Sequence, residues 1–421
     1  MHSGSLLSGV NTQQAAAITH FEGPALVVAG AGTGKTRVIT HRIANLLSQG
    51  VPPHQILAIT FTNKAAEEMK SRVLRLTGAQ GIFVSTFHSF CAYLLRREIQ
   101  HLDRDPRFTI YDDKDQRSLM RRVFRELGIS PQGDLTIPMA ARYVSEIKND
   151  LLDAKELTDS GEHPAWCDGV LLQIYRGYEK ALTECGGLDF DDLLQKSALL
   201  LEQQESVRLR YQSRFRFLLI DEYQDTNTAQ YSLARSLALE HENIFVAGDP
   251  DQSIYSWRGA RPQNLLRFEE DFGNPAIYPL EQNYRSTQTI LRAANELVTH
   301  NSLRKELTLW TENPAGSTIE HFINDDDYEE ARLIARRIST QIDEGIHPSD
   351  IAVFYRINSL SRKIEEALAR AGIPHAVIGS IGFYHRREIK DLMAYLHIKH
   401  NPYDWENFER AATTPKRGIG P

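Results

Sequence analysis

Short apolar runs alternate with helical patterns along much of the chain. Residues 25–29, 56–59, 217–220 and 244–247 are continuous apolar stretches, which are typical of strands buried on both faces of a sheet. Several of these runs are followed by a loop and then by apolar residues at helical spacing. This order predicts an α/β fold with a parallel sheet and crossover helices.

The pattern changes between residues 90 and 204. Strand-like runs vanish there, and apolar residues recur at helical spacing, as in Leu171, Ile174, Tyr178 and Leu182. We therefore predict a first α/β domain over residues 1–91 and 204–283, interrupted by a helical domain over residues 92–203.

A second α/β region is predicted over residues 284–380. Its helix carries apolar residues at helical spacing between Ala331 and Ile342, and residues 351–355 form an apolar run that predicts a strand. From residue 381 to 421 the pattern is helical again, which predicts the start of a second inserted helical domain.

Composition and charge say little about which function the protein has. The 421 residues are 41% hydrophobic and 24% charged, as in a globular protein of about three domains. A net charge of −7 does not indicate nucleic acid, although a local groove can still be basic. Cys91, Cys167 and Cys185 are widely spaced, which favours reduced thiols and a cytoplasmic location. No apolar run approaches the ~20 residues that span a membrane.

A glycine-rich loop follows the first predicted strand and precedes a helix. It matches the P-loop pattern, with alanine in place of the first glycine: Ala29, Gly30, Ala31, Gly32, Thr33, Gly34, Lys35 and Thr36. Such a loop turns backbone N–H groups onto phosphates at a helix N-terminus. We expect Lys35 to contact the β- and γ-phosphates of ATP and Thr36 to bind Mg²⁺.

Two acidic residues end another predicted strand. Asp221 and Glu222 directly follow the apolar residues 218–220. Alone, such a pair most often caps a helix, but beside a P-loop it indicates the second half of a nucleotide site. We expect Asp221 to bind Mg²⁺ and Glu222 to orient and deprotonate the attacking water. The sequence therefore predicts an NTPase.

Seven motifs occur in an order that resembles one family. They occupy residues 11–14, 29–36, 60–66, 85–89, 221–225, 248–259 and 281–286. Together they resemble the Rep/UvrD-like helicases of superfamily I over nearly the whole chain. The resemblance implies a RecA-like P-loop domain, part of a second RecA-like domain, and an ATP-dependent DNA helicase that moves 3′ to 5′ on a single strand.

The resemblance also implies roles in the nucleotide site. Gln14 would read the adenine edge, and Arg37 and Tyr284 would lie on the two faces of the adenine ring. Gln252 would sense the γ-phosphate, and Arg285 would act as an arginine finger. Taken alone, Gln14, Arg37 and Gln252 would be assigned to the solvated surface, Tyr284 to the core and Arg285 to a surface ion pair.

Contacts to single-stranded DNA require stacking rings and polar groups. By resemblance, the predicted strand track contains Thr60, Phe61, Thr62, Asn63, Thr86, Phe87, His88, Tyr255, Trp257, Arg258, Tyr355 and Arg356. Without the resemblance, aromatic residues at strand ends would more often be assigned to the core. The implied partners are single-stranded DNA, junctions of single and double strands, and accessory replication or repair proteins.

The family carries two further motifs after the position at which this sequence stops, Pro421. One contacts DNA, and the other supplies a second arginine to the γ-phosphate. We therefore expect a C-terminally truncated chain that does not unwind DNA alone. Two alternatives remain open: a nucleotide- and DNA-binding module without turnover, and the motor part of a helicase–nuclease.

Overall fold

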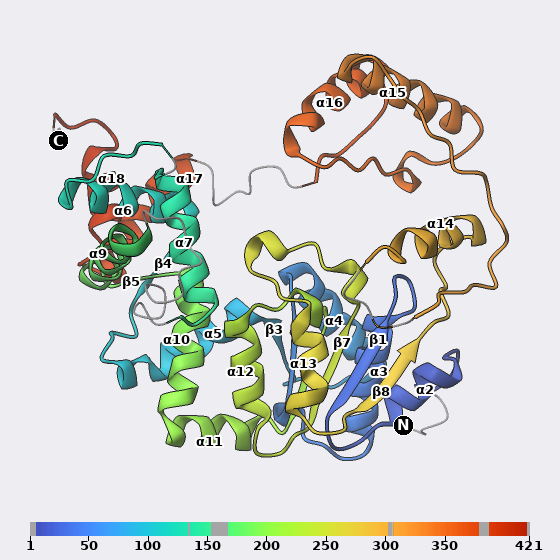
Figure 1. Cartoon of the computed structure of the whole chain (residues 1–421), viewed down its shortest axis with the longest axis horizontal. Helices are drawn as coiled ribbons and strands as arrows, with labels where there is room; N and C mark the ends of the chain where they lie inside the picture. Colours follow the sequence, from blue (N-terminus) through green and yellow to red (C-terminus); the bar gives the residue numbers. More distant parts are fainter. Residues whose placement is uncertain are drawn as a thin grey trace. The chain divides into compact units, whose positions relative to one another are not determined.

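The structure is a computed structural model that describes residues 6–133, 135–152, 167–301, 305, 307–378 and 387–418. The chain divides into two compact units (Figure 1). The larger unit comprises residues 1–316 and 394–421, and the smaller one comprises residues 317–393. All seven motifs recognised in the sequence lie in the larger unit.

A six-stranded parallel sheet organises the larger unit. Its strands, in spatial order, are β3 (Phe83–Thr86), β2 (Ile56–Thr60), β6 (Phe217–Ile220), β7 (Ile244–Gly248), β1 (Ala25–Ala29) and β8 (Ala276–Leu280). The four strands predicted in the first α/β domain are confirmed, and β3 and β8 extend the sheet at its two edges. Because all strands are parallel, the loops after their carboxyl ends meet at one edge of the sheet.

Successive residues of each strand enter two different cores. In β1, Leu26 and Val28 face one cluster, whereas Ala25, Val27 and Ala29 face the other. The second cluster lies under α2 (Thr12–Thr19), α3 (Lys35–Ser48) and α4 (Asn63–Thr77). The sheet is therefore covered on both faces, which explains why its strands are continuously apolar.

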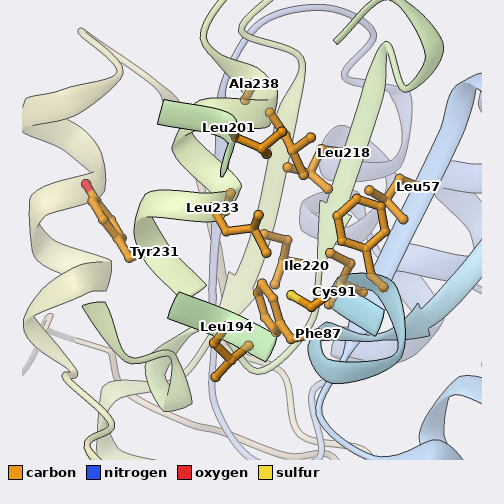
Figure 2. Close-up of a cluster of buried hydrophobic side chains, with 14 of the residues drawn as sticks. Leu57, Phe87, Cys91, Leu194, Leu201, Leu218, Ile220, Tyr231, Leu233 and Ala238 are labelled. Atoms are coloured by element: carbon orange, nitrogen blue, oxygen red, sulfur yellow. The ribbon is translucent and has the colours of Figure 1, made fainter. Parts of the chain in front are cut away.

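The first cluster joins the sheet to helices from distant parts of the sequence. These helices are α5 (Phe87–Glu98), α10 (Phe190–Gln203), α12 (Thr228–Ala238) and α13 (Gln263–Asp271). Figure 2 shows part of the cluster, with Leu57 and Leu218 from the sheet facing Cys91 of α5 and Leu233 of α12. Burial of these side chains fixes α5 and α10 against the sheet.

The segment between β3 and β6 is mainly helical, as the sequence pattern predicts. Besides α5 and α10 it contains α6 (Asp113–Glu126), α7 (Ile137–Asn149), the π-helix η3 (Cys167–Leu171), α9 (Leu172–Glu184) and α11 (Glu205–Arg214). It also contains a parallel pair of short strands, β4 (Thr109–Tyr111) and β5 (Gly187–Asp189). These three-residue strands were not predicted, because they are too short to produce a periodic pattern.

The smaller unit is built on α15 (Asp327–Asp343) and α16 (Ser361–Arg370). Helix α15 confirms the helix predicted around Ala331, and both helices bury apolar residues against each other. The strand predicted at residues 351–355 was wrong. Ile351 and Val353 pack on the helices, but Phe354 is 92% exposed and this segment has no strand partner within the described residues. An apolar run becomes a strand only where another strand pairs with its backbone.

The remaining helices are α14 (Gln288–Val298), α17 (Arg387–His400) and α18 (Trp405–Thr413). Contacts of buried polar groups join the end of the chain to the helices between β3 and β6: Tyr111 donates to Asp404 at 2.9 Å, and Asn401 donates to the Cys185 carbonyl at 2.9 Å. The domain boundary predicted at residues 380 and 381 lies outside the described residues.

Short 3₁₀ turns complete the fold. They are η1 (Pro53–Gln55), η2 (Ile99–Leu102), η4 (Tyr223–Asp225), η5 (Pro250–Gln252), η6 (Ser256–Arg258), η7 (Pro348–Asp350) and η8 (Asn358–Leu360). None of the helices in the described ranges combines the length and apolar composition needed to cross a membrane. Cys91 and Cys185 are buried free thiols, and the side chain of Cys167 lies outside the described residues.

Candidate functional site

The P-loop connects β1 to α3 at the carboxyl edge of the sheet. Gly32 and Gly34 have φ angles of 69° and 92°, in the left-handed region that favours glycine. A Cβ atom on Gly32 would also lie 2.5 Å from Nδ2 of Asn283, so any larger residue at this position would clash with the Asn283 side chain. Gly34 is the N-cap of α3 and provides no side-chain hydrogen bond. The loop therefore leaves the α3 N-terminus without a side-chain cap, as an anion site requires.

Lys35 and Thr36 begin α3 and point towards the sheet. The buried Lys35 ammonium donates a 3.0 Å hydrogen bond to the Ala29 carbonyl. The Thr36 hydroxyl donates to Oδ2 of Asp221 at 3.3 Å. The P-loop and the acidic end of β6 are thus in direct contact, as a shared magnesium site requires.

Asp221 and Glu222 lie side by side after β6. Burial, reinforced by the Glu222 charge, raises the pKa of Asp221 to about 6, while the nearby Lys35 charge opposes this shift. Glu222 has a φ of 52°, which is uncommon for a residue other than glycine, and its N–H donates to Asp221 Oδ1 at 3.0 Å. The left-handed backbone at Glu222 therefore accompanies a hydrogen bond from its own N–H to the carboxylate of the preceding residue.

Gln224, to which the sequence assigned no role, links two motifs. Its Nε2 donates to Glu222 Oε2 at 2.9 Å, and its Oε1 accepts from the Asp249 N–H at 2.9 Å. Asp249 Oδ2 in turn accepts from Gln252 Nε2 at 2.5 Å. A continuous hydrogen-bond path therefore runs from Glu222 to Gln252. The only sequence signal was the position of Gln224 inside the motif at residues 221–225.

Gln14 ties α2 to the P-loop. Its side chain is buried, accepts from the Asn11 N–H at 3.2 Å and donates to the Thr33 carbonyl at 2.8 Å. Each end of the amide keeps one further hydrogen-bonding capacity for a base. Arg37 is exposed nearby on α3, and Tyr284 is half exposed, with its hydroxyl 2.9 Å from Asn11 Nδ2.

The segment after β8 lies against the P-loop. The buried Asn283 donates to the Ala31 carbonyl at 2.6 Å, and the Tyr284 N–H donates to the Gly32 carbonyl at 3.0 Å. Asn283 also accepts from the Arg285 N–H at 2.8 Å. Asn283, which the sequence left without a role, therefore positions the backbone of Tyr284 and Arg285 beside the phosphate loop.

Three aromatic rings form a row at the same edge of the sheet, which we call the aromatic row: Phe61, Tyr255 and Trp257. The rings of Phe61 and Tyr255 are stacked with centroids 5.9 Å apart, and those of Tyr255 and Trp257 are 6.4 Å apart. Trp257 is 66% exposed. Thr62 caps α4 by accepting from the Ala65 N–H at 3.1 Å, and Asn63 follows it as the first residue of that helix.

Three residues predicted to contact DNA are covered by protein. Phe87 is 2% exposed and packs in the first core cluster, where Figure 2 shows its ring among sheet and helix residues. Thr60 and Thr86 are also buried, and Thr86 caps α5 through Ser89. The Phe87 ring therefore cannot stack on a base. The aromatic residue begins a helix that must bury its inner face against the sheet.

The other residues predicted to contact DNA lie in three different places, which are α5, the smaller unit and the η6 turn. The His88 ring makes an edge contact with Phe190 at 5.8 Å, beside Phe87 on α5. Tyr355 and Arg356 belong to the smaller unit, where Arg356 is exposed. The backbone of Arg258 ends η6, and its side chain lies outside the described residues.

Comparisons with known proteins agree with this arrangement of motifs. Residues 10–273 match the UvrD/REP helicase N-terminal domain, and residues 278–421 match the UvrD-like helicase C-terminal domain. Relatives named ATP-dependent DNA helicase PcrA occur in Bacillus subtilis (strain 168), 44% identical over 422 residues, and in Staphylococcus aureus (strain NCTC 8325 / PS 47), 44% identical over 424 residues.

A third relative of the same name, from Staphylococcus epidermidis (strain ATCC 12228 / FDA PCI 1200), is 43% identical over 420 residues. Each alignment covers 99% of this chain and 57% of the relative, so the chain spans little more than half the length of these proteins. The N-terminal domain match alone includes more than half of the residues. The chain therefore belongs to the UvrD/REP helicase family.

Proposed function

We propose that this chain provides the nucleotide-binding part of an ATP-dependent DNA helicase that moves 3′ to 5′ along a single strand. One observation carries the proposal: the P-loop contacts the acidic end of β6, and a hydrogen-bond path continues from there to Gln252. A protein that only bound phosphate would not need a carboxylate poised beside the loop and connected to a second motif. The names of the relatives support the same function.

The phosphate end of ATP would be held by Lys35 and the loop backbone of residues 29–36. Thr36 and Asp221 would hold Mg²⁺, because a hydroxyl and a carboxylate that already touch are oxygen donors of the kind this ion prefers. Bound Mg²⁺ would neutralise charge on the β- and γ-phosphates. Burial raises the pKa of Asp221 to about 6 in the empty site, and a bound cation would lower it again by favouring the ionised carboxylate.

Hydrolysis would depend on Glu222, Gln252 and Arg285. Glu222 would orient the attacking water and take its proton, and Gln224 would hold the Glu222 carboxylate. Gln252 would contact the γ-phosphate. Loss of that phosphate on hydrolysis would then be transmitted to the nearby η6 turn. Arg285 would offer its guanidinium fork to the transition-state charge from the segment that Asn283 fixes on the P-loop.

The adenine end would lie between Arg37 and Tyr284. Both side chains are exposed near the N-terminus of α3, so they can take the two faces of a base. Gln14 would read the base edge with its remaining donor and acceptor. The buried bonds from Gln14 to the P-loop would then connect base recognition to the phosphate loop.

Single-stranded DNA would stack on the aromatic row. The exposed Trp257 and the stacked pair of Phe61 and Tyr255 offer flat faces at the carboxyl edge of the sheet. Backbone contacts would come from Thr62, Asn63, His88, Arg258, Tyr355 and Arg356. Strand junctions and accessory replication or repair proteins complete the proposed partners, with a cytoplasmic location.

We also propose the domain division predicted from the sequence. A first RecA-like motor domain would comprise residues 1–91 and 204–283, with inserted helices at residues 92–203. A second motor-domain segment would comprise residues 284–380, and residues 381–421 would belong to another inserted helical domain. One sheet contains strands from residues 25–86 and 217–280, which supports the first domain, and the family matches, which end at residue 273 and begin at residue 278, support its boundary near residue 283.

The decisive experiment measures ATP hydrolysis by the purified chain with and without single-stranded DNA. We expect the chain to bind ATP and to hydrolyse it slowly in the presence of Mg²⁺, with little increase when DNA is added. Tight binding of ATP and DNA with no turnover under either condition would instead identify a binding module. A duplex with a 3′ tail and one with a 5′ tail then test strand separation and its direction.

A further inference from the structure

The carboxyl end of α7, in the helices between β3 and β6, contacts the loop that carries Tyr255 and Trp257 of the aromatic row. Asp150, directly after α7, accepts two hydrogen bonds from Arg261, from Nε at 3.0 Å and from Nη2 at 2.6 Å. This bidentate geometry is more directional than a single ion-pair contact. Arg261 lies only four positions after Trp257.

A second set of bonds joins the same helix end to the segment after the acidic motif. The buried Asn149, the last residue of α7, accepts from Asn227 Nδ2 at 2.7 Å. Thr228 donates to Asp150 Oδ1 at 3.1 Å. Residues 149 and 150 thus contact the start of α12 as well as Arg261.

The end of α7 is itself firmly held. Lys148 is fully buried and lies 2.7 Å from Glu179, 2.9 Å from Asp189 and 3.0 Å from Asp192. Breaking such a buried cluster would leave unpaired charges away from water. Asn149 also donates to Asp191 at 2.9 Å. Residues 149 and 150 therefore follow the inserted helices rather than moving alone.

The loop between Tyr255 and Arg261 is short and closed at its end. The Arg261 N–H donates to the Thr226 carbonyl at 2.9 Å, and the Ala260 N–H donates to the Tyr255 carbonyl at 3.1 Å. A displacement of Arg261 would therefore be transmitted to the rings of Tyr255 and Trp257. Thr226 directly follows the motif at residues 221–225 that contains Glu222, so both functional loops meet at this point.

We propose that Asp150 and Arg261 form a clamp by which the inserted helices position the aromatic row for single-stranded DNA. Asp150 is a positioning residue that acts through Arg261 and Trp257 and does not itself contact DNA. This inference rests on the proposed function, because it requires that the aromatic row binds a single strand.

A purely stabilising role predicts something different. Asp150 and Arg261 have side-chain exposures of 20% and 49%, and pairs at such exposure contribute little to stability. Their removal should leave the fold intact, so a large change in DNA affinity would have to come from the position of the loop.

The test measures binding of a fluorescein-labelled oligothymidylate to the whole chain by anisotropy over a range of salt concentrations. Asp150→Ala should weaken binding by about 2- to 30-fold, the usual range for residues that couple to a site without touching its ligand. Asp150→Asn, which keeps the shape and removes the charge, should show a smaller loss. The salt dependence should not change, because no phosphate contact is lost.

A double-mutant cycle identifies the route of the effect. In a Trp257→Ala background, Asp150→Ala should have almost no further effect on DNA affinity, because residues acting through one contact are not additive. Glu146→Ala is the matched control, since it removes an exposed ion pair with Arg142 on the same helix and should not change DNA affinity. Thermal melting of each variant monitors the fold.

The outcomes separate the two hypotheses. If the wild-type chain does not bind the oligonucleotide, the proposed function fails. If the wild-type chain binds, and both Asp150→Ala and Asp150→Asn bind as tightly as the wild type, only the clamp fails. Tighter binding by Asp150→Ala with a steeper salt dependence would also overturn the clamp, because Arg261 would then contact phosphate directly. Equal losses in Glu146→Ala and Asp150→Ala would overturn it too, because they would show a general effect of altering α7.

Discussion

The hydroxyl of Thr36 donates to Oδ2 of Asp221 at 3.3 Å, although the two residues are 185 positions apart along the chain. The contact forms because β1 and β6 belong to one parallel sheet, with only β7 between them. Strands of this kind deliver their following loops to the same edge. Two groups suited to one magnesium ion are therefore brought together by the sheet rather than by the P-loop alone.

Replacement of Lys35 by alanine is expected to lower the rate of ATP hydrolysis by at least ~100-fold, the usual loss for one donor to a developing charge. The fold should remain, because the hydrogen bond of the ammonium goes to the Ala29 carbonyl in its own loop. Steady-state ATPase assays and thermal melting measure the two effects. Lys70→Ala, which removes an exposed lysine paired with Glu67, is the control and should hydrolyse ATP normally.

Glu222→Gln is expected to bind ATP but to hydrolyse it at least ~100-fold more slowly, because general-base catalysis typically contributes 10²–10⁴-fold. An amide retains the size of the carboxylate and can still bond to Gln224. Nucleotide affinity from a fluorescent ATP analogue and turnover from phosphate release should therefore separate. Turnover close to the wild-type rate would show that Glu222 is not the base. Glu240→Gln, at an exposed position in the turn after α12, serves as the control.

Asp221→Asn is expected to stabilise the nucleotide-free protein above pH 6. The pKa of Asp221 is raised from 3.8 to about 6, so its favourable contribution is complete below pH 3.8 and is lost as the pH rises through about 6. Because asparagine stays neutral, the variant should avoid this loss, which is at most about 3 kcal/mol for a shift of this size. Melting curves between pH 4 and pH 8 in a chelating buffer should show a difference that fades towards low pH.

The same variant should lose Mg²⁺-dependent ATP binding, since the carboxylate is the proposed metal ligand. Asp105→Asn provides the matched control for the pH series. Hydrogen bonds from Arg107 hold the pKa of the exposed Asp105 at about 2, below its ordinary value, so this substitution should give no gain at pH 8. A destabilised Asp221→Asn protein at pH 8 would show that the ionised carboxylate stabilises the empty site, contrary to this prediction.

Trp257→Ala is expected to weaken binding of single-stranded DNA by ~1–3 kcal/mol, the usual contribution of one stacked base. Because the ring is 66% exposed, the melting temperature should hardly change. Phe87→Ala should behave in the opposite way: it removes a ring from the core and should destabilise the fold by about 3–5 kcal/mol. Unchanged DNA affinity in a folded Trp257→Ala protein would show that the indole does not take part in DNA binding.

The amino-acid sequence by itself determined the central sheet and the phosphate loop. Buried parallel strands are continuously apolar, so β1, β2, β6 and β7 were predicted at nearly their observed bounds. The P-loop was equally clear, because a few adjacent small residues before Lys35 are enough to form it. In both cases the information lies within a short stretch of chain.

Only the tertiary structure decided which residues meet across long separations. It buried Phe87, left residues 351–355 without a strand partner among the described residues, and placed Gln224 between Glu222 and Asp249. It also brought Asp150 to Arg261, 111 positions away. A ring, an apolar run or an amide has the same local pattern whether it packs, pairs or stays exposed. The energy that distinguishes these outcomes comes from partners supplied by distant segments when the sheet assembles.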